Sequence, residues 1–280
     1  MTYLLDRVQQ EVHATKLSDE AIITEAIKIV EEAEKRGIII RILGASAVKI
    51  HSMDAEELYK RLRRLNSDRS FTDIDLVGYS NQRAEIRQLM EKHLSFNISR
   101  QFLLLHGKDR LLYYHPQNLY SVDIFFDGLY FSHTILFGKI VNGRLELDKP
   151  TIPVTDILLE KLQIHQINEK DIKDIIVLLR SHGLGYIEDD MINLHRLSSI
   201  LGDDWGFWMD AVDNLRKTIR YAEEYYKQSI ITREEWEDVV RKSSELLDFL
   251  EKCQKTEKWE KRARKGIKEK YWNDVEEVLR

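Results

Sequence analysis

The sequence predicts an α+β protein, with a mixed α+β domain over residues 1–152 followed by an all-helical domain over residues 153–280. The stretch 97–147 alternates and is rich in aromatic and β-branched residues, which is typical of several short strands. From Thr155 onward the apolar residues recur only at helical spacing, and all the tryptophans lie in this half. This change from strand-like to helical spacing of the apolar residues predicts the domain boundary at residue 152.

The N-terminal half begins with a helical pattern over residues 6–36, which a glycine ends. The β-branched segment 38–43 then predicts a short buried strand, and residues 45–50 predict a helix directly behind it. Residues 54–65 predict a further helix, with Asp54 as its N-cap.

The middle of the chain predicts a strand over 73–79, a helix over 83–93 and strands within 97–147. Turns between these strands are expected at Gly107, Gly128 and Asn142-Gly143. Two prolines at positions 150 and 153 then precede helices over 155–166 and 168–181, with further helices to the C-terminus.

Composition limits the classes of protein that the chain can belong to. A net charge of −5 gives no global nucleic-acid signature, so a basic site has to be local. Cys253 is the only cysteine, which excludes an intrachain disulfide and a cysteine-based zinc site. The sequence shows neither a signal peptide nor a membrane span, and it therefore predicts a cytoplasmic protein.

Two aspartates one residue apart point to a chemistry. Asp73 and Asp75 lie on a predicted strand, where residues i and i+2 face the same side while Ile74 faces the other. Two like charges that close repel unless a cation lies between them, and Mg²⁺ prefers carboxylate oxygens together with substrate phosphates. The alternative is a strand edge with two solvated acids.

A third acid strengthens the metal-site interpretation. Asp123 stands inside the apolar strand 121–127, where a carboxylate is costly unless it is paired or bound to a metal. Three carboxylates from two strands can hold two metal ions for phosphoryl or nucleotidyl transfer. Asp127 shares the same face, but its neighbour Gly128 favours a turn position.

The turn Gly44-Ala45-Ser46 follows the predicted strand 38–43 and opens a helix. Backbone N–H groups at such a turn, with the Ser46 hydroxyl, can cradle a phosphate. A strand-to-helix turn with a capping serine is the other interpretation. The sequence contains neither a Walker loop nor GxGxxG.

Together these segments resemble the nucleotidyltransferase superfamily related to polymerase β, which has a mixed sheet flanked by helices. The resemblance extends to residues 158–164 and 168–175, which look like the lysine motifs of AbiEii-like and minimal nucleotidyltransferases of the toxin–antitoxin type. It covers roughly residues 36–182. The resemblance implies an enzyme that transfers NMP from an NTP to an acceptor hydroxyl with Mg²⁺.

The resemblance also implies a role for each matching residue. Gly44 and Ser46 would hold the triphosphate, and Asp73 and Asp75 would hold the metal ions. Asp123 would complete the metal site and deprotonate the acceptor hydroxyl.

In the second half, Lys161 would neutralise phosphate charge, with Asp171 as its supporting acid. Without the family, Lys161 is equally an exposed lysine on an amphipathic helix, and Asp174 equally a surface residue. The sequence departs from the family in an insertion over residues 51–70, which is expected to cover or shape the site.

The acceptor is left open by the sequence. The resemblance implies tRNA or a protein as acceptor and an antitoxin protein as partner. The alternatives are an antibiotic-type enzyme with a small-molecule acceptor and a non-catalytic nucleotide-binding or antitoxin-like module. Residues 252–270 hold nine basic residues against three acidic ones, so this helix could bind a polyanion with Trp259 stacking on a base. We favour a solvated helix whose tryptophan packs inward.

The histidines show no metal-ligand spacing such as HExxH, and core or surface roles are expected for them. His165, one turn after Lys161, is the histidine within reach of the predicted site.

Overall fold

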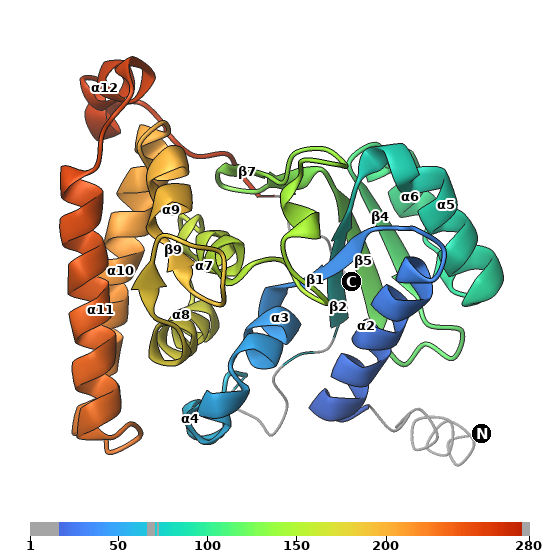
Figure 1. Cartoon of the computed structure of the whole chain (residues 1–280), viewed down its shortest axis with the longest axis horizontal. Helices are drawn as coiled ribbons and strands as arrows, with labels where there is room; N and C mark the ends of the chain where they lie inside the picture. The colour runs from blue at the N-terminus through green and yellow to red at the C-terminus, as the bar shows by residue number, and fades with distance from the viewer. Residues whose placement is uncertain (1–16, 66–70, 72, 276–280) are drawn as a thin grey trace, which may run out of the picture.

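The computed structural model describes residues 17–65, 71 and 73–275. It shows a mixed α+β fold in which a small sheet is flanked by helices and followed by a largely helical half (Figure 1). The predicted helix 6–36 is present as α2 (Asp19–Glu34), while residues 6–16 lie outside the described part of the chain. The same is true of residues 66–70 of the insertion.

The sheet has the strand order β1-β2-β5-β4-β3. Strands β2 and β5 run parallel, whereas the other neighbouring pairs are antiparallel. Val, Ile, Leu and Phe side chains fill both faces, which explains why β1 and β5 are mostly apolar apart from Arg41, Ser121 and Asp123. The strands are β1 (Ile40–Leu43), β2 (Asp73–Gly78), β3 (Asn97–Ile98), β4 (Arg110–Tyr114) and β5 (Ser121–Phe126).

Helices of the first half surround this sheet (Figure 1). Helix α3 lies between β1 and the second half, while α5 and α6 lie on the far side. These elements are α3 (Gly44–His51), the 3₁₀ turn η1 (Met53–Ala55), α4 (Glu56–Leu62), the 3₁₀ turn η2 (Ser80–Gln82), α5 (Arg83–Gln88), the π-helical turn η3 (Leu89–His93) and α6 (Arg100–His106).

The second half packs its helices mainly against one another. Polar caps start several of them: the Asn168 side chain accepts a hydrogen bond from the Asp171 N–H, and Thr232 and Glu235 form a capping box. The helices are α7 (Val154–Leu162), α8 (Glu169–Ser181), α9 (Leu194–Leu201), α10 (Trp205–Lys227), α11 (Arg233–Lys252) and α12 (Glu257–Ala263).

Short elements complete the described chain. They are the hairpin of β6 (Gly128–Tyr130) and β7 (Thr134–Leu136), the parallel pair β8 (Leu184–Gly185) and β9 (Ile192–Asn193), and the 3₁₀ turns η4 (Arg144–Glu146) and η5 (Gly266–Lys268). No helix in the described ranges is long and apolar enough to cross a membrane.

Several local predictions were wrong. Asp54 is not an N-cap, because it lies inside η1 and Ala55 precedes α4. Residues 97–147 contain α6 as well as strands, since the Ser99 side chain caps a helix at this point. The half predicted to be wholly helical contains β8 and β9, and α7 ends at Leu162 rather than at 166.

The join between the two halves fixes where α7 lies. Thr151 forms a parallel bridge with Ile42, and the Ile152 N–H donates to the Ile42 carbonyl at 3.0 Å. The chain therefore runs along the free edge of β1 and enters α7 at Val154, directly after Pro153. This path places α7 and α8 against α3, which begins at the end of β1.

A second connection joins the halves at the other end of the molecule. Asp210 on α10 contacts His133 beside β7, with 2.7 Å between its Oδ2 and the His133 Nε2. After α12 the chain returns toward β7 (Figure 1), where the Asn273 N–H donates to the Ser132 carbonyl at 2.9 Å.

Candidate active site

Two of the predicted carboxylates lie side by side at the centre of the sheet. In the parallel pairing of β2 with β5, Asp75 is the register partner of Asp123, and Asp73 that of Ser121. Ile74 is fully buried, whereas Asp73 and Asp75 keep partial exposure, as the alternation along a strand requires. The expectation that Asp123 joins the first two aspartates is consistent with this register.

Gly44 packs directly against the Asp75 carboxylate. It opens α3 with φ +71°, a conformation that L side chains rarely adopt, and a Cβ at this position would lie 2.9 Å from Asp75 Oδ2. The register Leu43–Asp75 between β1 and β2 sets this approach. Ser46 is buried one turn into α3. Glycine therefore fits this position for two reasons: φ is positive, and a Cβ would collide with the Asp75 carboxylate.

Glu160 on α7 is a site residue that the sequence analysis missed. Its Oε2 accepts a hydrogen bond from the Gly44 N–H at 3.0 Å, and its side chain is almost fully buried. The amide predicted to face a phosphate is thus occupied by a carboxylate in this structure. The available signal was an acid within the run Leu158-Leu159-Glu160, on a helix that has no exposed face.

Burial and mutual repulsion make these carboxylates reluctant to ionise. Burial, with the nearby charges of Asp123 and Glu160, raises the pKa of Asp75 to about 7. Burial also raises the pKa of Glu160, although Lys161 and the Gly44 N–H oppose this effect. For Asp123, burial raises the pKa against the opposing influence of Arg110.

Arg110, on the neighbouring strand β4, is a second residue that the sequence analysis missed. Its guanidinium makes a two-pronged ion pair with Asp123, the Nε lying 2.6 Å from Oδ1. The guanidinium carbon also lies 4.6 Å from the centre of the Phe125 ring. Arg110 therefore supplies cationic charge to the third carboxylate of the predicted triad.

Lys161 lies in a buried ion cluster, with its Nζ also 3.9 Å from Glu160 Oε1. Its Nζ lies 3.1 Å from Asp171 Oδ1 and 3.1 Å from Asp174 Oδ2, and Arg64 Nε lies 2.8 Å from Asp174 Oδ1. The surface alternatives for Lys161 and Asp174 were wrong, because their side chains are 5% and 0% exposed. Asp171 contacts Lys161, and its role as a supporting acid in catalysis stays a prediction.

The charges of the ion cluster shift the pKa values of Asp171 and Lys161. Burial raises the pKa of Asp171, but Lys161 and Arg64 outweigh it and the net pKa is lowered. The acids also raise the pKa of Lys161 in spite of its burial. In this arrangement two of the three N–H donors of Lys161 are directed to carboxylates.

His165 does not join the carboxylates. Its Nδ1 lies 2.9 Å from Asp210 Oδ1, and its ring stacks on Trp272 with 3.7 Å between the ring centroids. This histidine belongs to the connection between α10 and the C-terminal segment.

Carboxylate oxygens are the ligands that a hard cation prefers. Asp73 and Asp75 point to one face, and Asp123 is in register with Asp75. The ligand atoms of these three residues do not form a group within 4.8 Å among the described residues, so their joint binding of Mg²⁺ stays a prediction. A divalent cation would favour the ionised form of Asp75, which the neighbouring acids disfavour. Comparison of the chain with family models, with curated proteins and with solved structures finds no match.

Replacing Gly44 tests its contact with Asp75, and Gly37 provides a matched control. Both glycines have φ near +70°, but a Cβ at Gly37 would meet no atom within 4 Å. We expect Gly37→Ala to cost about 1–2 kcal/mol through backbone strain. Gly44→Ala should cost about 1 kcal/mol more because its Cβ collides with the carboxylate. Urea unfolding measures both values, and equal costs would show that the carboxylate moves aside freely.

The raised pKa of Asp75 predicts a pH-dependent stability of the metal-free protein. Its folded pKa of about 7 lies above the unfolded value of about 3.9, so the folded state binds more protons between these limits. The contribution of Asp75 to stability is therefore lost as the pH rises from about 4 to about 7. Relative to Asp75→Asn, the wild type should become progressively less stable across this window when unfolding free energies are measured with EDTA present.

The exposed Asp109 supplies the control for this experiment, and Asp109→Asn should leave the pH profile unchanged. A constant stability difference between wild type and Asp75→Asn from pH 4 to 7 would show that Asp75 ionises normally.

Proposed function

We propose that the chain is a metal-dependent nucleotidyltransferase, which transfers NMP from an NTP to an acceptor hydroxyl and releases pyrophosphate. The observation that carries the proposal is the in-register pair Asp75–Asp123, with Gly44 packed against the Asp75 carboxylate. Carboxylates from adjacent strands beside a glycine turn provide metal ligands and a close approach for phosphate in one place.

Each residue has a role in this proposal. Asp73 and Asp75 would hold Mg²⁺, which would supply positive charge to the triphosphate. Gly44 lets the turn approach Asp75 closely, and Glu160 would have to release the Gly44 N–H before a phosphate could accept from it. Asp123 accepts the proton of the acceptor hydroxyl, with Arg110 holding its carboxylate in place. Catalysis consists mainly of positioning and charge stabilisation.

One observation favours a second candidate, a non-catalytic nucleotide-binding or antitoxin-like module. The guanidinium of Arg110 pairs with Asp123, and Lys161 is held by Asp171 and Asp174. A protein that only binds a nucleotide could keep both arrangements, because no proton needs to move. Mg²⁺-dependent turnover separates the two candidates.

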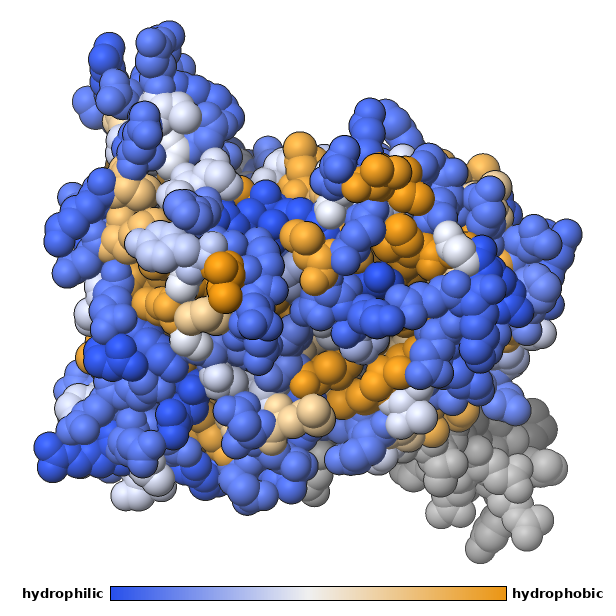
Figure 2. Space-filling model, viewed as in Figure 1, coloured by the Kyte–Doolittle hydropathy of each residue, from blue (hydrophilic) through white to orange (hydrophobic). Residues whose placement is uncertain are grey.

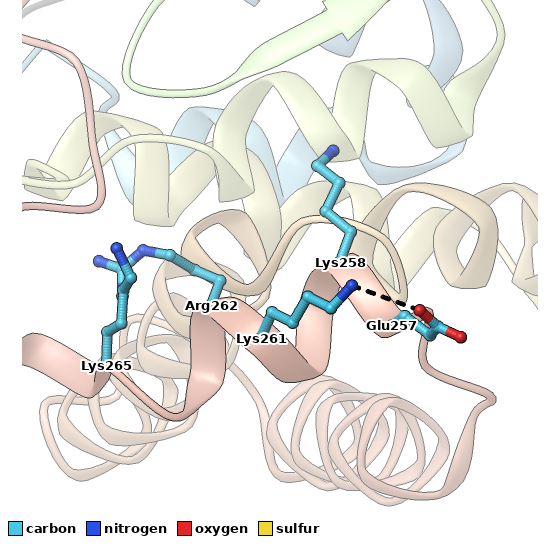
Figure 3. Close-up of a pocket in the computed structure, with 5 residues that line it drawn as sticks. All are labelled: Glu257, Lys258, Lys261, Arg262 and Lys265. Atoms are coloured by element: carbon cyan, nitrogen blue, oxygen red, sulfur yellow. Dashed lines mark hydrogen bonds and ion pairs between the residues drawn. The ribbon is translucent and has the colours of Figure 1, made fainter.

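Helix α12 is the surface that would favour an RNA acceptor. It presents Lys258, Lys261 and Arg262 beside Glu257, and with Lys265 just after the helix they line a shallow hollow (Figure 3). Hydrophilic side chains cover this end of the molecule (Figure 2). Acids within reach balance part of the charge, since Lys261 pairs with Glu257 at 3.4 Å.

Trp259 packs edge-on against Trp208, with 5.3 Å between the ring centroids, as the inward-packing alternative expected. Because Trp259 packs against Trp208, the case for an RNA acceptor depends on the basic side chains of this surface. A protein acceptor, an antitoxin partner and a small-molecule acceptor are the other possibilities within this proposal, and the cytoplasm is the compartment that we propose.

Nucleotide transfer is tested by incubating the protein with each labelled NTP, Mg²⁺ and total cellular RNA or protein. Labelling of an acceptor should require Mg²⁺ and should be lost, by a factor of about 1,000 or more, in Asp73→Ala and in Asp75→Asn. Asp109→Asn, an exposed change of the same charge, should retain full transfer. Circular dichroism and thermal melting establish that the inactive variants are folded.

Undiminished transfer by a folded Asp75→Asn variant would overturn the assignment of the site. Mg²⁺-dependent NTP binding without any labelled product would instead favour the non-catalytic module.

The acceptor class is tested by neutralising α12. If RNA binds there, Lys261→Gln combined with Lys265→Gln should weaken RNA binding and lower the slope of log affinity against log salt by about 2. The control pair Lys217→Gln and Lys227→Gln removes the same charge from α10 and should have little effect. Gel-shift titrations at several salt concentrations give the slopes. Unchanged slopes would exclude α12 as an RNA surface and favour a protein or small-molecule acceptor.

A further inference from the structure

Two histidines and an aspartate meet at the far end of α3 from Gly44. His51 is the last residue of α3, and His182 is the C-cap residue of α8. Asp190 lies in the loop before β9, with φ +52°. One ring nitrogen from each histidine and one carboxylate oxygen of Asp190 lie within 4.8 Å of one another. This cluster is separate from the carboxylates on β2 and β5.

The distance between His51 and Asp190 matches an edge of a zinc coordination shell. Asp190 Oδ1 lies 3.2 Å from His51 Nδ1, and one ring nitrogen of His182 lies within 4.8 Å of both. Ligands about 2.0–2.1 Å from a tetrahedral Zn²⁺ are separated by about 3.3 Å. The separation of 3.2 Å is long for a hydrogen bond between an imidazole and a carboxylate, for which about 2.7–2.9 Å is usual.

The opposite nitrogen of His51 has the partners that a metal-bound imidazole usually has. His51 Nε2 lies 2.6 Å from Thr151 Oγ1 and 3.3 Å from Asp148 Oδ2. A metal-ligating histidine commonly donates its other N–H to a carboxylate or another acceptor, which fixes the ring and leaves the first nitrogen as the ligand. Nδ1 of His51 is then the nitrogen that faces Asp190.

His182 is available as a neutral ligand. Its side chain is 1% exposed, and burial lowers its pKa although the charge of Asp190 opposes this effect. A neutral imidazole carries the lone pair that a metal needs. The Nδ1–H donates to the Asp190 carbonyl at 3.0 Å, which leaves the lone pair on Nε2. Nε2 is buried and has no hydrogen-bond partner within the described part of the chain, so it is the nitrogen available to a metal.

Asp190 gives the cluster an opening to solvent. Its side chain is 67% exposed, so water can reach the position that the two histidines leave open. The acids around the cluster, Asp148 and Asp190 beside His51 and Asp54 near His182, provide the negative charge that a dication requires. Two imidazole nitrogens with a carboxylate oxygen suit Zn²⁺ better than Mg²⁺, which prefers oxygen.

We propose that His51, His182 and Asp190 bind one Zn²⁺, with water as the fourth ligand. The ion links the end of α3 to the end of α8 and to the β8–β9 loop, and so joins the two halves of the chain. The site neither uses nor requires the acidic cluster of the proposed transferase.

Zinc binding is measured on the metal-free, tag-free full chain by competition with a chromophoric chelator. The wild type should bind one equivalent of Zn²⁺, and Zn²⁺ should raise its melting temperature by mass action. Asp190→Asn and His182→Asn should each weaken binding by more than the roughly tenfold to hundredfold cost of losing an outer partner. His93→Asn, at an exposed histidine elsewhere, should bind like the wild type.

The Asp75→Asn variant tests whether Zn²⁺ binds at the carboxylates on β2 and β5 instead. It should keep wild-type Zn²⁺ affinity. Equal Zn²⁺ binding by wild type and Asp190→Asn would overturn the proposal, as would loss of Zn²⁺ in Asp75→Asn. If His182→Asn does not fold, the exposed position of Asp190 allows Asp190→Asn to decide the question alone. Failure of nucleotide transfer leaves this test unaffected.

Discussion

Two adjacent, ion-paired side chains on α7 connect this helix to α3 and α8. Glu160 accepts a hydrogen bond from the Gly44 N–H at the start of α3, while Lys161 contacts Asp171 and Asp174 on α8 and lies 3.9 Å from Glu160 Oε1. Buried charges are tolerated only when they are paired, so a shift of α7 would break these contacts together. The position of α3, and with it the glycine turn beside Asp75, depends on this helix.

Several buried acids around α7 are paired with cations. Asp156 on α7 pairs with Arg144 and Arg196, and Asp123 pairs with Arg110. Burial raises the pKa of Asp75 and of Glu160, which reduces the cost of burying these two carboxyl groups. A bound divalent cation would favour their ionised forms.

Much of the first half follows from local sequence, and the site follows only in part. Strand alternation placed Asp73 and Asp75 on one face, and the cost of a lone acid in an apolar strand identified Asp123. Arg110 could not be found in this way, because its ion pair depends on the register between β4 and β5. The role of Glu160 could not be predicted from the sequence, because α7 is buried on every side and its acids do not mark an exposed face.

Contacts between distant segments were the hardest to predict. His51 and His182 have no ligand spacing in the sequence, and the edge path of the chain along β1 is what places α3 beside α8. Asp54 fitted the pattern of an N-cap but lies in a 3₁₀ turn, since a propensity for capping does not fix where a helix begins. The nucleotidyltransferase assignment and the domain boundary at residue 152 stay predictions.

The connection at Asp210 has a consequence for how a ligand enters. The His133–Asp210 contact is buried, and the Asn273–Ser132 hydrogen bond ties the returning chain to the same turn. A hinge between the two halves would have to break these contacts as well as the bridge from Thr151 to Ile42. A ligand of the proposed site would therefore meet two halves that are already held together, and it would lose little ordering entropy on association.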